Sequence, residues 1–405
     1  MLVEPLVRSM AEYQQIEVGL TDGQARHLQA AAGPRLTLTP SANGYAVRAS
    51  SYVGSIAVPG FVLHVLPKVP VVNVLHLMMW STERIAFDQT EIGQASGSLT
   101  PAVAAWYARM LERTLVLGVD RTYVEAADRI VALRGRIDWP AQAKAVGLPT
   151  PIACRYDEWS IDTRPNRIVA AAAQILLRNP AVPPQSAFVL RRLLRLLTGV
   201  GPLRADDLCS NSQVLSRLNE HYRSTVQLAR LILQGGGPVH GVGHAAVSSF
   251  MIDMNAVFED FVFANLSRRL RATWHVNKRV VPLDVARHVP TEPDLLFTDL
   301  SGATVLVADS KYKLTSDGRG RNADYYQLLA YCTSLGLPRG VLIYCDTDGD
   351  APAPPRSIEV RRAGTVLETF RVRLFGSFND IDREFDRLTG HLHRGMDSLS
   401  HASAP

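Results

Sequence analysis

An aspartate and a lysine at the end of a predicted β-strand are the residues of this sequence best suited to chemistry. Asp309 and Lys311 follow the apolar run 304–308 and are separated by one residue. Because successive side chains of a strand alternate, both are predicted to lie on one face. Asp294 comes fifteen residues earlier, in Glu-Pro-Asp. Two aspartates supply the hard oxygen ligands that Mg²⁺ prefers, and metal-activated water beside a lysine can attack a phosphate.

Two predicted helices carry further candidates for the same site. Glu259, on a predicted helix over 254–266, lies among the apolar residues of its face, and we predict it as a third metal ligand. A single acid in such a position is more often exposed or salt-bridged, so that alternative stays open. Gln327 and Tyr331 are one helical turn apart on a predicted helix over 324–332. Gln327 is predicted to position the phosphate or the attacking water, with Tyr331 in support.

Basic residues surround these candidates. Lys313, Arg319 and Arg321 fall in a loop with glycine and serine between Lys311 and the second helix. Cationic side chains in such a loop favour phosphate contacts, so we predict that these three residues, together with Tyr331, bind DNA. The alternative for the loop residues is an ordinary solvated surface.

Composition and length limit the classes of protein that the chain can be. Its 405 residues predict two or three domains, and 47% hydrophobic and 20% charged residues are ordinary for a globular protein. The net charge of +5 admits an anionic partner. The 4 cysteines form no C-x-x-C pair, which argues against a zinc site and favours reduced thiols. Without a run of about 18 apolar residues or a signal peptide, we expect a soluble cytoplasmic protein with no membrane association.

The pattern of elements predicts a multidomain α+β protein. We expect a β-rich N-terminal domain, a mainly helical middle region, a C-terminal α/β domain with a central mixed sheet, and a tail. Their predicted ranges are 1–75, 76–235, 239–395 and 396–405. Asn43-Gly44 between two alternating segments is a strong hairpin signal, and the glycines before Pro238 mark the clearest boundary.

The ordered acids, the D-x-K strand and the Q-x-x-x-Y helix resemble the PD-(D/E)xK nuclease superfamily, in its branch with that helix. A longer resemblance is to the McrC family, the nuclease subunits of McrBC modified-cytosine restriction systems. The segments that carry the longer resemblance are Tyr52-Val-Gly54, Pro67-Lys68-Val69, Arg134-Gly-Arg-Ile137, Tyr156-Asp-Glu158, Asp162-Thr-x-x-Asn166-Arg167 and Met254-Asn-x-x-Phe258-Glu259.

The resemblance implies a Mg²⁺-dependent endodeoxyribonuclease with a PD-(D/E)xK fold in its C-terminal domain. Its catalytic residues would be Asp294, Asp309, Lys311, Glu259 and Gln327, and its metal ligands Asp294, Asp309 and Glu259. It also implies that the N-terminal half docks on a McrB-like AAA+ GTPase hexamer, stimulates GTP hydrolysis and acts on methylated double-stranded DNA. The sequence has no G-x-x-x-x-G-K-[ST], so we expect no nucleotide site in this chain and GTP on the partner. Cleavage of both strands needs two active sites, which favours homodimerisation through the nuclease domain.

Two other functions stay open on the sequence. One is a freestanding Mg²⁺-dependent repair or recombination nuclease, which would cut without a partner. The other is a non-catalytic subunit that activates an AAA+ GTPase and uses its basic surface only to hold DNA. The intact Asp294, Asp309 and Lys311 favour catalysis over the second alternative.

Overall fold

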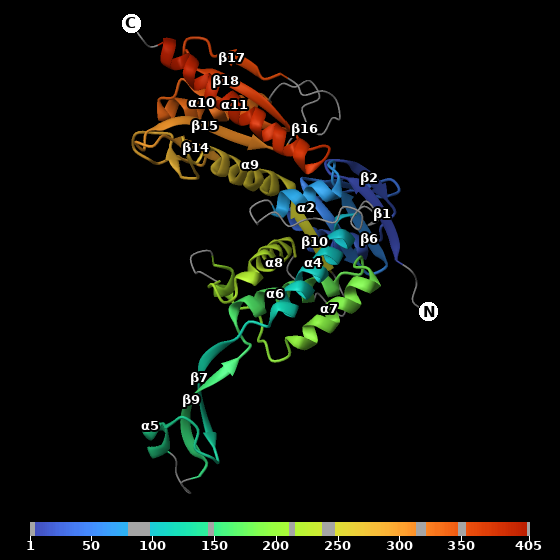
Figure 1. The fold of residues 1–405 in the computed structure, drawn as a ribbon. Helices are drawn as coiled ribbons and strands as arrows, with labels where there is room; N and C mark the ends of the chain where they lie inside the picture. The colour runs from blue at the N-terminus through green and yellow to red at the C-terminus, as the bar shows by residue number, and fades with distance from the viewer. Residues whose placement is uncertain are drawn as a thin grey trace. The chain divides into compact units, whose positions relative to one another are not determined.

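A computed structural model of the chain shows a mixed α+β protein with several sheets, which is the predicted class (Figure 1). The residues that it describes are 5–79, 98–144, 150–209, 215–236, 248–312, 321–346 and 354–402. They divide into two compact units, one made of residues 1–103 and 237–405 and the other of residues 104–236. This division differs from the three consecutive domains of the sequence analysis. No helix in the described ranges is long and apolar enough to cross a membrane.

The first unit contains a four-stranded sheet in which three N-terminal strands pair with one strand from residues 248–253. Its strands, in spatial order, are β1 (Leu6–Ala11), β6 (Phe61–Leu66), β5 (Tyr52–Val58) and β10 (Ser248–Asp253). β10 pairs antiparallel with β5 and places Met251 opposite Gly54. Gly54 has φ 140°, and a Cβ there would lie 2.1 Å from the carbonyl oxygen of Phe250. Only glycine therefore allows the two strands to approach so closely.

A smaller three-stranded sheet lies in the same N-terminal part. Its strands, in spatial order, are β2 (Gln15–Val18), β4 (Gly44–Ala49) and β3 (Leu36–Ser41). The predicted hairpin is present, with a turn at residues 42–43 and Gly44 opposite Ser41. α1 (Asp22–Ala32), followed by the 3-10 turn η1 (Gly33–Arg35), buries Leu28 against the apolar side chains of both sheets.

A six-stranded mixed sheet forms the C-terminal part of the first unit. Its strands, in spatial order, are β11 (His275–Asn277), β14 (Leu295–Thr298), β15 (Thr304–Lys311), β16 (Arg339–Asp346), β18 (Val366–Arg373) and β17 (Arg356–Glu359). β15, β16 and β18 are parallel, whereas β14 and β17 run antiparallel to their neighbours. A two-stranded ribbon of β12 (Val281–Pro282) and β13 (Pro290–Thr291) lies beside it.

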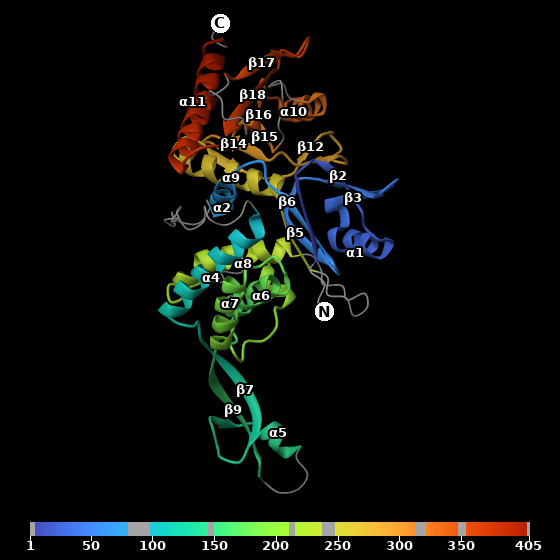
Figure 2. The same cartoon turned by 90° about the vertical axis from the view of Figure 1, so that its right-hand side faces the viewer.

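Helices cover both faces of this sheet. α10 (Asn322–Leu335) packs on one face, and α9 (Met254–Leu270) and α11 (Phe378–Ala402) pack on the other (Figure 2). Phe261 of α9 meets Phe385 of α11 edge to face, with ring centroids 5.1 Å apart. α2 (Val71–Met79) packs against α9. The two faces of the sheet therefore have different neighbours, and this decides which side chains can meet.

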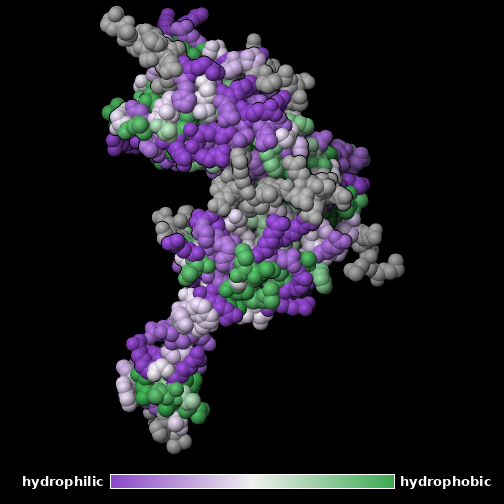
Figure 3. All heavy atoms as spheres, in the orientation of Figure 1, coloured by the Kyte–Doolittle hydropathy of each residue, from purple (hydrophilic) through white to green (hydrophobic). Residues whose placement is uncertain are grey.

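The second unit is helical, with a long β-arm. Its elements are the larger part of α4 (Leu99–Leu117), β7 (Thr122–Ile130), β8 (Arg136–Ile137), α5 (Trp139–Ala143), β9 (Ile152–Ser160), α6 (Arg164–Arg178), α7 (Pro184–Leu196), η2 (Ala205–Leu208), η3 (Glu220–Tyr222) and α8 (Arg223–Gly235). β7 and β9 pair from Thr122–Ser160 to Ile130–Ile152, so the middle region that the sequence predicts as mainly helical also contains long strands. Hydrophobic surface gathers at the end of this arm (Figure 3), where Val131, Leu133 and Trp139 are exposed.

Candidate active site

Asp309 and Lys311 lie at the carboxyl end of β15 and form an ion pair. The pair confirms that alternation places both side chains on one face of the strand. Val307 has the same orientation and packs with Leu328 and Tyr331, so this is the face that α10 covers. Asp309 is 1% exposed, and the Lys311 side chain is 20% exposed. A buried acid thus stands next to a lysine that solvent still reaches.

Asp294 is fixed beside this pair from the neighbouring strand. It directly precedes β14, and the backbone N–H and hydroxyl of Ser310 donate hydrogen bonds of 2.8 and 3.0 Å to its Oδ2. Burial, and then the negative charge of Asp294, raise the pKa of Asp309, although Lys311 opposes the shift. Burial works against the charged form of Lys311, but the pKa of Lys311 is raised because Asp309 and Asp294 stabilise its ammonium.

The predicted glutamine and tyrosine of α10 contact each other as their spacing implies. Gln327 Nε2 donates a 2.9 Å hydrogen bond to the Tyr331 hydroxyl. Gln327 itself is exposed, so its amide can reach a ligand. Tyr331 is only 3% exposed, and its ring packs in the core with Leu328. Tyr331 therefore supports Gln327 from the core, and its contact with DNA stays a prediction.

Asp324, which the sequence analysis missed, is a further acid near the site. It lies in the first turn of α10, is 3% exposed, and accepts a 2.8 Å hydrogen bond from the Tyr344 hydroxyl. Its negative charge also contributes to raising the pKa of both Asp309 and Lys311. The sequence did contain a signal for Asp324, because it is an acid three residues before Gln327 on the same predicted helix.

Glu259 lies elsewhere. It is on α9, the helix of the opposite face, and Lys278 Nζ contacts its Oε1 at 2.7 Å and Asp260 at 3.2 Å. In the part of the chain that the structure describes, no three Asp, Glu, His or Cys side chains gather closely enough to hold a metal ion. The structure therefore places Glu259 in the salt bridge that the sequence left open, and not with Asp294 and Asp309.

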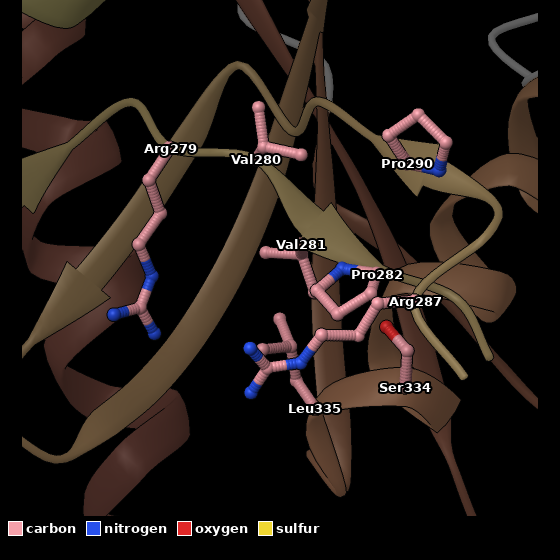
Figure 4. A pocket seen from close by; sticks show the side chains of 8 residues that line it. All are labelled: Arg279, Val280, Val281, Pro282, Arg287, Pro290, Ser334 and Leu335. Atoms are coloured by element: carbon pink, nitrogen blue, oxygen red, sulfur yellow. The ribbon is translucent and has the colours of Figure 1, made fainter. Parts of the chain in front are cut away.

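The predicted DNA-binding loop is only partly described. Lys313 and Arg319 lie outside the described residues, and Arg321 is exposed at the start of α10. A pocket of about 500 Å³ beside α10 offers further cations. Figure 4 shows the guanidinium groups of Arg279 and Arg287 in this pocket, with Leu335 of α10 beside Arg287. α10 thus links the pocket to Gln327.

The donor set at Asp294 and Asp309 fits a hard divalent cation. Both residues offer carboxylate oxygens, which Mg²⁺ prefers. Apart from its ion pair with Lys311, Oδ2 of Asp309 accepts no hydrogen bond from a described residue. The mutual repulsion of the two acids would be relieved by a cation. Asp294 and Asp309 are therefore suited to Mg²⁺.

Comparison with known proteins gives a family match and several structural matches, of which two are described here. A family model described as a McrBC 5-methylcytosine restriction system component matches residues 47–345. A chain of the refined half-complex from a tetradecameric assembly of Thermococcus gammatolerans McrB AAA+ hexamers with bound McrC has a similar fold. Its TM-score is 0.64 at 18% identity, covering 96% of this chain and 100% of that one.

The second structural match is a chain of the cryo-EM structure of the Thermococcus gammatolerans McrBC complex. Its TM-score is 0.45 at 22% identity, and the match covers 65% of this chain and 88% of that one. Among curated proteins, none matches.

Proposed function

The chain belongs to the family of McrBC 5-methylcytosine restriction system components, and we propose that it is the DNA-cleaving subunit of such a system, similar to McrC. The observation that carries the proposal is the buried Asp309–Lys311 pair with Asp294 beside it. Its placement at the end of a strand in a mixed sheet supports a nuclease domain of the PD-(D/E)xK type. The proposed reaction is Mg²⁺-dependent hydrolysis of a DNA phosphodiester bond.

Each residue of the site has a proposed role. Asp294 and Asp309 would hold Mg²⁺, which when bound supplies Lewis acidity toward the phosphate oxygens. Lys311 donates hydrogen bonds to the phosphate as negative charge develops on it, because its ammonium is partly exposed and held by Asp309. The exposed amide of Gln327 positions the phosphate or the attacking water. Tyr331 accepts one hydrogen bond from that amide and so fixes its direction.

The DNA backbone would continue from this site along α10. Arg279 and Arg287 line the pocket, and guanidinium groups bind phosphates well. Arg321 is exposed at the other end of the same helix. We place the phosphates next to the scissile bond along this line of cations, and we retain Lys313 and Arg319 as predicted contacts.

A partner would supply the GTP-driven step. The structural match of TM-score 0.64 is described as McrB AAA+ hexamers with bound McrC, and we propose a similar AAA+ GTPase hexamer as the partner of this chain. Without a P-loop sequence in this chain, GTP would be bound by the partner. The exposed Val131, Leu133 and Trp139 at the end of the β-arm fit a docking surface, because clustered exposed apolar residues mark interaction sites.

Reconstitution tests this function. The chain, its AAA+ partner, Mg²⁺, GTP and methylated double-stranded DNA should together give cleavage. Asp294→Ala and Lys311→Ala should each lower the cleavage rate about 100- to 1000-fold, while partner binding and GTPase stimulation stay unchanged. Arg383→Ala on the exposed side of α11 is the control and should cleave normally.

Three results would contradict parts of the proposal. Normal cleavage by both site variants would show that Asp294 and Lys311 have no catalytic role. GTPase stimulation without any cleavage would favour the non-catalytic activator. Cleavage by the chain and Mg²⁺ alone would favour the freestanding nuclease.

A further inference from the structure

A buried glutamate of the four-stranded sheet β1-β6-β5-β10, called the N-terminal sheet below, reaches the end of the candidate catalytic strand β15. Glu12 directly follows β1 and is 1% exposed. Its backbone N–H donates to Leu66 of β6, and its Oε1 accepts a 2.8 Å hydrogen bond from the backbone N–H of Lys68. The same Oε1 accepts a 2.9 Å hydrogen bond from the hydroxyl of Tyr312, which is 300 positions away in the chain. A buried acid is retained at low cost only when it is bonded in this way.

Tyr312 is the residue next to Lys311. It is 4% exposed, and its ring lies 6.1 Å from the ring of Phe258 on α9. Since neighbouring side chains of an extended segment point to opposite faces, Tyr312 anchors the segment from the α9 side while Lys311 serves the α10 side. The hydroxyl of Tyr312 is therefore the point at which the N-terminal sheet holds the strand end.

Strand pairing supports this strand end on one side only. The pairing of β15 with β14 stops at Ala308, opposite Leu295. Beyond Ala308 only β16 pairs with the strand, and the last pair is Lys311 with Tyr344. The position of Lys311 thus depends on β16, on the hydrogen bonds from Ser310 to Asp294, on the ion pair with Asp309 and on the anchor at Tyr312.

The N-terminal sheet also holds the start of α9. The hydroxyl of Ser51 donates a 2.9 Å hydrogen bond to Asp253, which caps the helix by accepting from the N–H of Asn255. The N–H of Met254 donates to the carbonyl of Ser51. Glu12 therefore belongs to a set of links by which the N-terminal sheet fixes both the strand and the helix that packs behind it.

We propose that Glu12 is a positioning residue for the active site: through its hydrogen bond to Tyr312 it fixes the end of β15 and hence the place of Lys311. The inference rests on the proposed nuclease function. It makes the N-terminal sheet part of the framework of the catalytic site. Glu12 touches neither substrate nor metal in this account, so its effect on the reaction passes entirely through Tyr312.

Four variants of the full chain, assayed with the AAA+ partner, Mg²⁺, GTP and DNA, test this inference. Tyr312→Phe removes only the hydroxyl, and Glu12→Ala removes its acceptor. Glu12→Gln keeps an acceptor oxygen for Tyr312. The amide nitrogen would replace Oε2, which accepts no hydrogen bond from a described residue, so the change breaks none. Tyr107→Phe is the matched control, because its buried hydroxyl donates a 2.7 Å hydrogen bond to Val169 in the second unit.

We expect Tyr312→Phe and Glu12→Ala to lower kcat about 10- to 100-fold, because small misplacements of catalytic groups are costly. KM for DNA and GTPase stimulation should stay at the wild-type level. Glu12→Gln should have the wild-type kcat. Tyr107→Phe should also have the wild-type kcat, although its loss of thermal stability should be comparable with that of Tyr312→Phe.

The possible failures are distinguishable. Wild-type kcat in Tyr312→Phe overturns the positioning role while leaving the nuclease function intact. An equal loss of kcat in Tyr107→Phe, or no rescue by Glu12→Gln, also overturns it. Absence of cleavage by the wild-type chain overturns the proposed function and the positioning role together.

Discussion

Two buried clusters of charged residues lie in different units of this chain, and they differ in charge balance. In the first unit, Asp309 has Asp294 and Asp324 as negative neighbours and one lysine as its counter-ion. In the second unit, Arg167 donates two 2.9 Å hydrogen bonds to Asp207 and one of 3.1 Å to Asp162. The pKa of Asp309 is raised by burial and by like charges, whereas the hydrogen bonds from Arg167 lower the pKa of Asp207.

The difference distinguishes a candidate functional site from a structural cluster. The structural cluster consists of the ion pairs of Arg167 with Asp207 and Asp162, and we call it the brace. A buried acid with too little positive charge around it is unfavourable unless something else, such as a metal ion or a substrate, completes it. A bidentate arginine–carboxylate pair is already complete and holds its segments together. The Asp162…Asn166-Arg167 segment, noted in the sequence for its resemblance, is thereby explained as structural: Asn166 also bonds the carbonyl of Asp120 and the hydroxyl of Tyr222.

The largest effect should follow from breaking the brace. Arg167→Met leaves Asp207 and Asp162 without their main counter-ion and should lower the free energy of unfolding by about 3–5 kcal/mol. Chemical denaturation of the full chain measures this loss. At temperatures where the variant stays folded, DNA cleavage should persist, since the brace belongs to the second unit and the site to the first. A stable variant would show that the cluster is not a brace.

At the site, we expect a substitution to change the free energy of unfolding by less and in the opposite direction. Because the pKa of Asp309 is raised, its ionised form destabilises the metal-free protein above that pKa. Asp309→Asn should therefore be more stable than wild type at alkaline pH, by on the order of 1 kcal/mol. The difference should vanish as pH falls through the raised pKa toward the usual aspartate range. Denaturation in chelator at several pH values measures it, and lower stability of the variant at alkaline pH would contradict the charge imbalance.

Asp207→Asn should show the reverse pH dependence. The pKa of Asp207 is lowered, so its stabilising contribution is complete above the usual aspartate range. The variant should be less stable than wild type at neutral pH, with the gap closing as pH falls through the lowered pKa. Thermal unfolding of both proteins between neutral and strongly acidic pH measures this difference in stability. A difference that grows on acidification would contradict a stabilising role of the ionised Asp207.

The smallest effect is expected at the pocket. Arg279→Ala and Arg287→Ala should each weaken DNA binding several-fold and reduce the salt dependence of log K by about one unit per lost phosphate contact. Titration of labelled DNA at several salt concentrations measures both. Arg383→Ala serves again as the control, and equal losses in all three variants would indicate only a general effect of net charge.

Local patterns in the sequence predicted the parts of the fold that depend on neighbouring residues. Alternation placed Asp309 and Lys311 on one face, and helical spacing placed Gln327 beside Tyr331. The hairpin at Gly44 followed from its turn residues. Each of these rests on residues close together in the chain, where geometry is regular.

Long-range contacts were not predictable in the same way. β10 was assigned to the last domain, yet it pairs with β5. Its partner is about 200 positions away, and no local pattern encodes that choice. Glu259 was placed with the aspartates because the sequence does not tell which face of the sheet α9 covers. Asp324 was overlooked because its importance depends on Tyr344 and Asp309 meeting it in space.

The central claim is that the unbalanced cluster is a Mg²⁺-dependent nuclease site. Asp309→Asn removes one proposed ligand with little change in size, so its cleavage of methylated DNA with the AAA+ partner and GTP, measured across a Mg²⁺ titration, tests the claim most directly. We expect Mg²⁺-dependent cleavage by wild type and none above background by the variant at any Mg²⁺ concentration, with GTPase stimulation intact. Cleavage by the variant at the wild-type rate would contradict it.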